Sequence, residues 1–466
     1  MILMKPSLFS LLCLALASCT VGPNHVKPDV SDITPAKWKW KSAQPRDEAP
    51  KGEWWTVFKD RELNRLESLA VSNNNDLRAA MARLDQAMAA IRVSSAALSP
   101  QVDGAVGAQR ERTSGNPPSP VPIAIPSAQI NSFSVPLQLS YELDLWGRIR
   151  RSIESVRAQA EGTTADYQTV MLSLTGEVAS AYFQLCALDA ELASLKRTFD
   201  SREKSTGIIE QRFKAGVLPE VDAARARSEL ASTRAEMADV KRQREELVAG
   251  IALLCGQPAS TFSIAARTVS DHVPSIPSGL PSSLLERRPD IASAERKVAA
   301  RSAQIGAEIA GYFPAIQLTG QGGYLSKDTS SLFTADTRVW SVGPSVSIPV
   351  TGLFITKAKV NRAKSAHQEA IADYRQTVLS AIKDVETSLT QIHYRGEQMA
   401  AQSEAVTAAQ RATELVRSRY EGGTVSYLEL LDAERTSLAH ERRNSQIKAQ
   451  RLIATVRLIK ALGGRW

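Results

Sequence analysis

The sequence predicts a membrane protein of the α+β class, made mostly of long coiled-coil helices with four transmembrane β-strands in each chain. Three observations predict it: a half-chain pattern that occurs twice, two very long helical runs, and short segments in which apolar and polar residues alternate. Each half has the order helix, strand, loop, strand, very long helix, turn, long helix. The fold therefore contains an internal duplication.

The duplication is clearest at two turns between helical runs. Gly423 lies 207 residues after Gly216, and the residues around the two glycines correspond. The same offset holds without gaps from about Val135 to Gly256 of the first copy, and upstream it becomes 214. A period this long indicates a duplicated half-chain rather than a solenoid repeat.

The N-terminus has the features of a secretory signal. Residues 1–18 carry Lys5, no acidic residue and a short leucine-rich core, which is too short for a membrane span. Leu16-Ala17-Ser18 before Cys19 resembles a bacterial lipobox, so we expect a lipid on Cys19 as the one covalent group, with no other cofactor. Ordinary cleavage near Ala17 is the alternative.

These features divide the chain into a signal peptide (1–18), a lipidated tail (19–60), a first repeat (61–256), a linker (257–283) and a second repeat (284–466). The tail is rich in Pro, Lys and Trp, and we expect it to be extended. The first repeat is expected to begin with one helix from Asp60 to Leu98, ended by Pro100. Cys186 and Cys255 lie in apolar helical runs, where a free cysteine is usually buried.

The β-strands are predicted from alternation. Apolar and polar residues alternate strictly from about Ser132 to Leu145 and again from about Trp340 to Val350. That pattern is typical of strands with one apolar and one polar face. Their hairpin partners, about Gln101–Arg112 and Ala315–Tyr324, alternate more weakly. A sandwich would also alternate, but a secreted, lipid-tagged chain favours transmembrane strands.

Four strands cannot close a barrel, because their edges would stay unpaired in lipid. A barrel must then be shared between chains, with a strand number that is a multiple of four. Eight strands leave no lumen, whereas twelve leave a narrow one. A homotrimer is therefore favoured if the barrel conducts.

A helical run from Gly147 to Phe213 contains no proline. Its apolar residues are spaced alternately by four and three, which is a heptad pattern. They are Tyr167, Met171, Leu174, Val178, Ala181, Leu185, Leu188, Leu192, Leu195 and Phe199. A soluble coiled coil is the alternative, but in both copies a strand leads directly into the helix.

Composition argues against two classes of function. The 57 Lys and Arg against 49 Asp and Glu give a net charge of +8, but the charges are dispersed, which favours solvated helix faces over nucleic-acid binding. No phosphate-binding loop, nucleophile elbow or zinc-protease helix is present, and the five His are scattered. We expect no enzyme activity, no catalytic residue and no metal site.

The second turn is the candidate functional site. Gly422 and Gly423 are expected to end one helix in a left-handed conformation. Either Thr424 or Ser426 is expected to cap the next helix, and Glu429 is in position for a capping box with Ser426. Leu428, Leu431, Asp432 and Arg435 then share one helix face, and in the first copy Asp222 and Arg225 take the places of Glu429 and Asp432. In a closed ring of hairpins, charged pairs here would hold a narrow end shut; plain capping and exposed pairs are the alternative.

Five motifs, spread over nearly the whole chain, carry a family resemblance. They are Cys19 with Val21-Gly22-Pro23-Asn24, Trp54-Trp55, Tyr141-Glu142-Leu143-Asp144-Leu145-Trp146-Gly147-Arg148, Glu286-Arg287-Arg288-Pro289-Asp290, and Arg419-Tyr420 with Gly423 and Tyr427-Leu428 to Asp432-Ala433. With this set of motifs the sequence resembles the NodT-type lipoproteins of the TolC-like outer membrane factor family.

The resemblance implies a homotrimer in the outer membrane of a Gram-negative bacterium, with a twelve-stranded β-barrel above an α-barrel of twelve periplasmic helices. It implies the exit duct of a tripartite efflux system, passive in itself, which docks on a periplasmic adaptor protein and an inner-membrane pump. It also implies that the duct opens by untwisting of the tip hairpins. A non-conducting coiled-coil scaffold lipoprotein is the alternative function.

The resemblance also assigns roles to residues of this sequence. The constriction falls on Leu428, Asp432 and Arg435, with Tyr420 and Glu429 adjacent, and the turns at Gly216, Gly422 and Gly423 are expected to meet the adaptor. Some relatives carry a basic residue where this chain has Val425. We expect Arg225 or Arg435 to replace it in holding the tip closed.

Overall fold

The structure is a computed structural model that describes residues 20–34, 52–115, 127–268, 274 and 288–464. The chain divides into two compact units, each built from segments far apart in sequence. The strand unit comprises Met1–Pro28, Leu84–Thr163 and Ala294–Tyr374, and the hairpin unit comprises Asp29–Arg83, Thr164–Ser293 and Arg375–Trp466.

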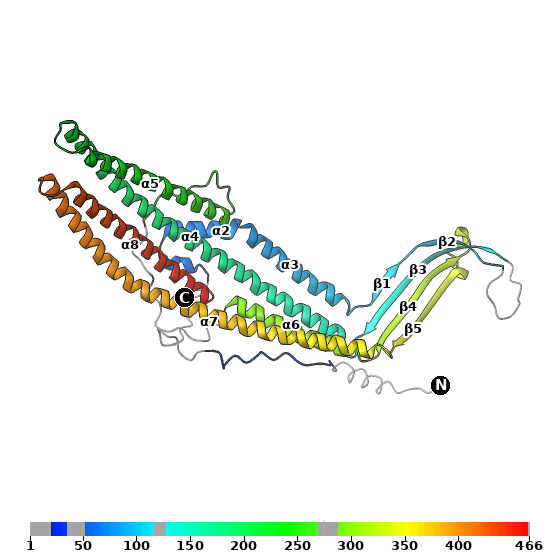
Figure 1. Ribbon diagram of the computed structural model, residues 1–466. Helices are drawn as coiled ribbons and strands as arrows, with labels where there is room; N and C mark the ends of the chain where they lie inside the picture. The colour runs from blue at the N-terminus through cyan, green and yellow to red at the C-terminus, as the bar shows by residue number, and fades with distance from the viewer. Residues whose placement is uncertain (1–19, 35–51, 116–126, 269–273, 275–287, 465–466) are drawn as a thin grey trace. The chain divides into compact units, whose positions relative to one another are not determined.

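The strand unit holds one antiparallel sheet (Figure 1). Its strands are β1 (Gln101–Gly104), β2 (Gly107–Arg112), β3 (Gln129–Leu143), β4 (Ala315–Ser326) and β5 (Arg338–Ser347). β1 and β2 both pair with β3, which pairs with β4, which pairs with β5. The predicted strands are confirmed, although the partner expected over 101–112 is two pieces and β3 begins at Gln129 and ends at Leu143.

Glycine permits the close pairing of β3 and β4. Gly323 is opposite Pro136, and a Cβ atom at Gly323 would lie 2.2 Å from the carbonyl oxygen of Val135. Several large apolar side chains of the sheet are exposed in the single chain, including Trp340 at 80%. Such a surface needs an apolar environment or another protein surface to cover it.

The helices repeat with the predicted offsets, which confirms the duplication. α5 (Glu220–Leu254) corresponds to α8 (Tyr427–Ala461) and α3 (Asn75–Ala96) to α6 (Pro289–Ala310). The very long helices are α4 (Arg148–Lys214), with 67 residues, and α7 (Leu353–Glu421), with 69. No helix within the described ranges combines the length and the apolar character that a membrane span requires.

The prediction of a single helix from Asp60 to Leu98 is wrong, because the helix is interrupted at Asn74. The chain forms α2 (Arg61–Asn73) and α3, and between them Asn74 is extended, with φ −62° and ψ 129°. The Asn74 side chain accepts a hydrogen bond from the Leu77 amide at 2.9 Å and donates one to the carbonyl oxygen of Leu254, also at 2.9 Å. Asn74 therefore caps α3 while it ties the junction to α5.

The extended-tail prediction is wrong for the last part of residues 19–60. A 3₁₀-helix, η1 (Trp54–Phe58), buries Trp54, Trp55 and Phe58 in the core of the hairpin unit. Trp54 Nε1 donates to Thr175 Oγ1 of α4 at 3.1 Å, because a buried indole N–H needs an acceptor. The same core contains the two predicted free cysteines, both buried.

The first described residues of the tail are extended along the strand unit. The Val21 amide donates to the carbonyl oxygen of Trp146 at 3.1 Å, and Arg151 donates to Asn24 Oδ1 at 2.8 Å. His25 and Glu295 lie 2.6 Å apart in the same unit. The predicted lipidation residue Cys19 and the signal peptide lie outside the described residues.

Candidate gate at the helical tips

The two tip turns have the same backbone geometry. Gly216 has φ 74° and Gly423 has φ 73°. One residue later, the amides of Val217 and Thr424 donate to carbonyl oxygens five residues back, each at 2.9 Å. These bonds satisfy the ends of α4 and α7 in the manner of a Schellman motif, in which glycine tolerates the left-handed position.

The second turn has the predicted capping box. Ser426 Oγ accepts from the Glu429 amide, and the Glu429 side chain accepts from the Ser426 amide. The first turn has Pro219 at this position, with no side-chain cap. Of the two consecutive glycines, only Gly423 is left-handed.

This difference between the glycines gives a matched test. Replacing Gly423 with Ala should cost about 1–2 kcal/mol, because an L-residue is strained in the left-handed region. Gly422→Ala should not destabilise the protein, because its Cβ would meet the nearest atom at 3.5 Å and alanine favours a helical turn. Thermal unfolding of both variants measures the difference, and equal losses would contradict the assigned turn.

An apolar joint connects the two hairpins near the tips. Tyr427 and Leu431 of α8 pack against three buried residues of α4 and α5, namely Ile209, Ala223 and Ala226. Leu431 is therefore buried in the joint, whereas Leu428, which was predicted to lie on the same helix face, is exposed. Burial raises the pKa of Tyr427 to about 12, so its hydroxyl stays protonated at neutral pH.

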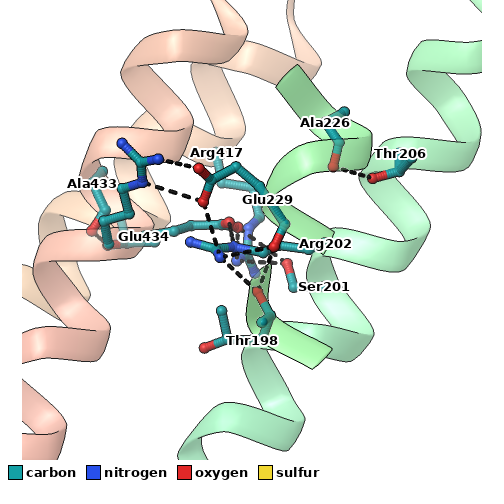
Figure 2. Close-up of polar contacts among 12 residues, drawn as sticks. Thr198, Ser201, Arg202, Thr206, Ala226, Glu229, Arg417, Ala433 and Glu434 are labelled. Atoms are coloured by element: carbon teal, nitrogen blue, oxygen red, sulfur yellow. Dashed lines mark hydrogen bonds and ion pairs between the residues drawn. The ribbon is translucent and has the colours of Figure 1, made fainter. Parts of the chain in front are cut away.

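A buried arginine, Arg202, lies on α4 near the joint. Figure 2 shows Arg202 of α4 between Glu229 of α5 and Glu434 of α8. Its side chain is 5% exposed; Nη1 lies 3.2 Å from Glu229 Oε2, and Nε lies 3.9 Å from Glu434 Oε2. Nη1 also donates to Thr233 Oγ1 at 2.7 Å. A buried arginine needs such partners because its desolvation is costly.

Two further arginines extend the cluster to a fourth helix. Arg417 of α7 donates to Glu434 at 3.0 Å and to Ser201 at 3.1 Å. Arg435 of α8 donates to Glu229. Charges therefore alternate from Arg417 through Glu434, Arg202 and Glu229 to Arg435. We call these five residues the tip network; it joins both hairpins of the chain.

Part of the tip network has a charge-reversed counterpart in the first hairpin. Arg227 of α5 donates to Glu210 of α4 at 2.9 Å. These residues lie 207 positions before Glu434 and Arg417, so each hairpin has one ion pair at the same distance from its turn, with the charges exchanged. Oppositely charged residues at the same two positions relative to each turn are therefore a signal in the sequence that could have identified Glu434 and Arg417.

Comparison with known proteins decides the family. A sequence model described as "Outer membrane efflux protein" matches residues 66–257 and again residues 280–464. The two matches begin and end at corresponding positions of the duplicated halves. The chain belongs to the outer membrane efflux protein family.

Similar proteins agree over almost the full length. The chain is 32% identical over 97% of its length to the pyoverdine export outer membrane protein OpmQ of Pseudomonas aeruginosa, of which it covers 95%. It is 31% identical over 98% of its length to the cation efflux system protein CusC of Escherichia coli, of which it covers 97%. The solved structure of the outer-membrane channel OprN is 31% identical with a TM-score of 0.86, over 96% of this chain and 99% of that one.

Family membership places the chain as an outer membrane efflux channel of a Gram-negative bacterium. The family is one of channels rather than enzymes. Its members are outer membrane components of efflux systems, which implies adaptor and inner-membrane pump partners. The α+β fold with long helices agrees with the solved channels.

Most of the remaining predicted residues of this efflux protein lie outside the buried joint. Leu428, at 51% exposure, and Asp432 are exposed on α8, and Asp432 has no hydrogen bond or ion pair among the described residues. Tyr420 packs against the joint, with its ring centroid 6.0 Å from that of Tyr427. Arg225 lies 4.0 Å from Asp222 on its own helix. The constriction role of these residues stays a prediction.

Proposed function

We propose that the protein is a homotrimeric exit duct whose periplasmic end is closed at the helical tips. One observation carries the gating part: the tip network joins the first and second hairpins through Arg202 and Arg435. Opening by separation of the hairpins must break these contacts or rearrange them. The apolar joint around Tyr427 is a second contact between the hairpins, and its side chains must slide past one another or separate when the hairpins move apart.

The trimer is supported by the sheet of the strand unit. β5 and the pair β1 and β2 form its two edges, and each edge has backbone groups without a partner strand among the residues that the structure describes. In lipid such edges must pair. Counting β1 and β2 as one interrupted strand, three chains supply the twelve strands of a barrel with a narrow lumen.

A lipid on Cys19 fits the path of the tail. Val21 is hydrogen-bonded to Trp146, which follows the end of β3. An acyl chain two residues earlier would therefore be attached next to the strand–helix junction, where a membrane boundary is expected. Several acyl chains on one cysteine give a stable anchor, and mass spectrometry of the intact protein tests for them.

The energy for export is proposed to come from the inner-membrane pump, with an adaptor that meets the turns around Gly216, Gly422 and Gly423. These turns carry exposed residues. Related channels are named for pyoverdine export and for cation efflux. Relatives with such different cargo suggest that selectivity lies mainly in the partner pump.

Arg435→Ala tests the gate. Removing the guanidinium deletes the direct contact of α8 with Glu229 and weakens the attachment between the hairpins, so single-channel conductance in planar bilayers should rise severalfold over that of the wild-type protein. Arg443→Ala is the matched control, because Arg443 is exposed on the same helix and has no ion pair among the described residues. Its conductance should stay at the wild-type value. Equal conductance of the wild type and Arg435→Ala would contradict a role of Arg435 in closing the tip.

A further inference from the structure

We propose that a polar pocket between the two hairpins binds a small anion that carries several carboxylate or phosphate groups together with hydroxyl groups. The pocket has a volume of about 590 Å³ and lies wholly within the hairpin unit. Side chains from α4, α5, α7 and α8 line it. It lies apart from the tip network, and none of the gate residues lines it.

The cations of the pocket are only partly balanced. Arg442 is held by Glu191 at 2.6 Å and Glu236 at 3.0 Å. Arg395 and Arg457 have no ion pair among the described residues. Neither guanidinium group is therefore neutralised by an ion pair in the part of the chain that the structure describes, although Arg395 donates to Gln398 Oε1 at 2.6 Å, and both groups attract anions from solution.

An adjoining pocket extends the positive charge. It has a volume of about 310 Å³, shares Gln391 and Arg457 with the first pocket, and adds Lys460. Lys460 has no ion pair within the described ranges. The acidic residue of this second pocket, Asp384, lies 3.5 Å from Arg288 and is thus already partnered. The two pockets share lining residues, and together they have an excess of positive charge.

The other polar groups of the first pocket are amides. Five glutamines line it: Gln184, Gln243, Gln391, Gln446 and Gln450. Four of them, all but Gln243, make no hydrogen bond to the described protein. Each amide offers both donors and an acceptor, which suits ligand hydroxyl groups.

The ligand class follows from this combination. A guanidinium group binds a carboxylate or a phosphate through two parallel hydrogen bonds, and amides select for hydroxyl groups beside it. A cation would be repelled by Arg395, Arg457 and Lys460. An apolar molecule would leave the arginines and glutamines without their water. The site needs only the folded hairpin unit, so the inference does not depend on channel opening.

Citrate is the probe, because it combines three carboxylates with one hydroxyl group. Isothermal titration of the full-length, detergent-purified protein at low ionic strength should show one citrate site per chain, and glycerol should show none. Arg457→Gln and Arg395→Gln should each weaken citrate binding about tenfold, as expected for one charge-assisted hydrogen-bonded pair. Arg443→Gln, which removes the same charge outside the pocket, should bind like the wild type.

A second variant covers the case in which an arginine change disturbs folding. Gln391→Leu keeps the side-chain size and the net charge, and it should also weaken citrate binding if the amides contact the ligand. The absence of citrate binding to the wild type, or equal citrate affinity of the wild type and all three pocket variants, would overturn the inference. Conductance of the same preparations tests the duct separately, so either proposal can fail alone.

Discussion

Replacing Arg202 with Met should destabilise the protein by about 3–5 kcal/mol, more than any exposed substitution at the tip. The reason is the charge left behind. Glu229 and Glu434 are held in the tip network by Arg202, and the Glu434 side chain is only 7% exposed. Without the guanidinium, two nearby carboxylates must stay ionised without their buried partner or take up protons. The hairpins should separate more easily, so conductance should rise as well.

The matched control is Arg197→Met on the same helix. Arg197 pairs with Glu441 at 2.7 Å, but its side chain is 65% exposed, so its loss should cost no more than about 1 kcal/mol. Adding Glu229→Gln and Glu434→Gln to Arg202→Met should recover much of the lost stability, because the buried charges are then gone. Denaturant unfolding measures all three proteins. Equal losses for Arg202→Met and Arg197→Met would contradict a buried tip network.

The second large expected effect is a dependence of protein stability on pH, caused by Glu67 in α2. Its side chain is fully buried in the hairpin unit, and neither carboxylate oxygen has a hydrogen-bond partner among the described residues. Burial raises the pKa of Glu67 from 4.5 to about 9. The carboxyl group therefore stays protonated in the folded protein at neutral pH.

The sign of the pH dependence follows from linkage. Below pH 4.5, Glu67 is protonated in both the folded and the unfolded chain. In this range the contribution of Glu67 to the free energy of unfolding has its full value. Between pH 4.5 and about 9, only the unfolded chain loses this proton. The contribution of Glu67 to the free energy of unfolding thus falls by about 1.4 kcal/mol per pH unit over this window.

Glu67→Gln should remove this dependence. Between pH 5 and pH 8 the unfolding temperature of the wild type should fall more steeply than that of Glu67→Gln, with the largest difference at the alkaline end. Glu177→Gln, on an exposed position of α4, should follow the wild-type curve. Parallel curves for the wild type and Glu67→Gln would show that Glu67 has a partner or solvent access.

Patterns within one segment allowed much of the fold to be predicted. Glycines set the positions of the tip turns, because only they take a positive φ without strain. Alternation identified β3 and β5, and the repeat offset aligned α5 with α8. The break at Asn74 was missed because its cause is distant in sequence: the Asn74 amide group bonds to the carbonyl oxygen of Leu254.

The candidate site was harder to predict for the same reason. Arg202 and Glu434 lie on different hairpins. In a helical sequence with many charged residues, each of them is predicted to be exposed to solvent. Their burial depends on how the two hairpins pack. Leu428 and Leu431 are equivalent in chemistry and spacing, yet packing buries Leu431 at 3% exposure and leaves Leu428 at 51%. Periodicity defines a helix face but does not say which neighbour covers it.

We propose that three chains form one duct that is closed at its tips. The most direct test is single-channel conductance of the detergent-extracted wild-type protein, with its mass measured in the same detergent. We expect a trimer with a small, stable conductance that rises in Arg435→Ala and Arg202→Met. A monomer, or a trimer that conducts in none of these forms at any voltage, would contradict it and favour a scaffold lipoprotein.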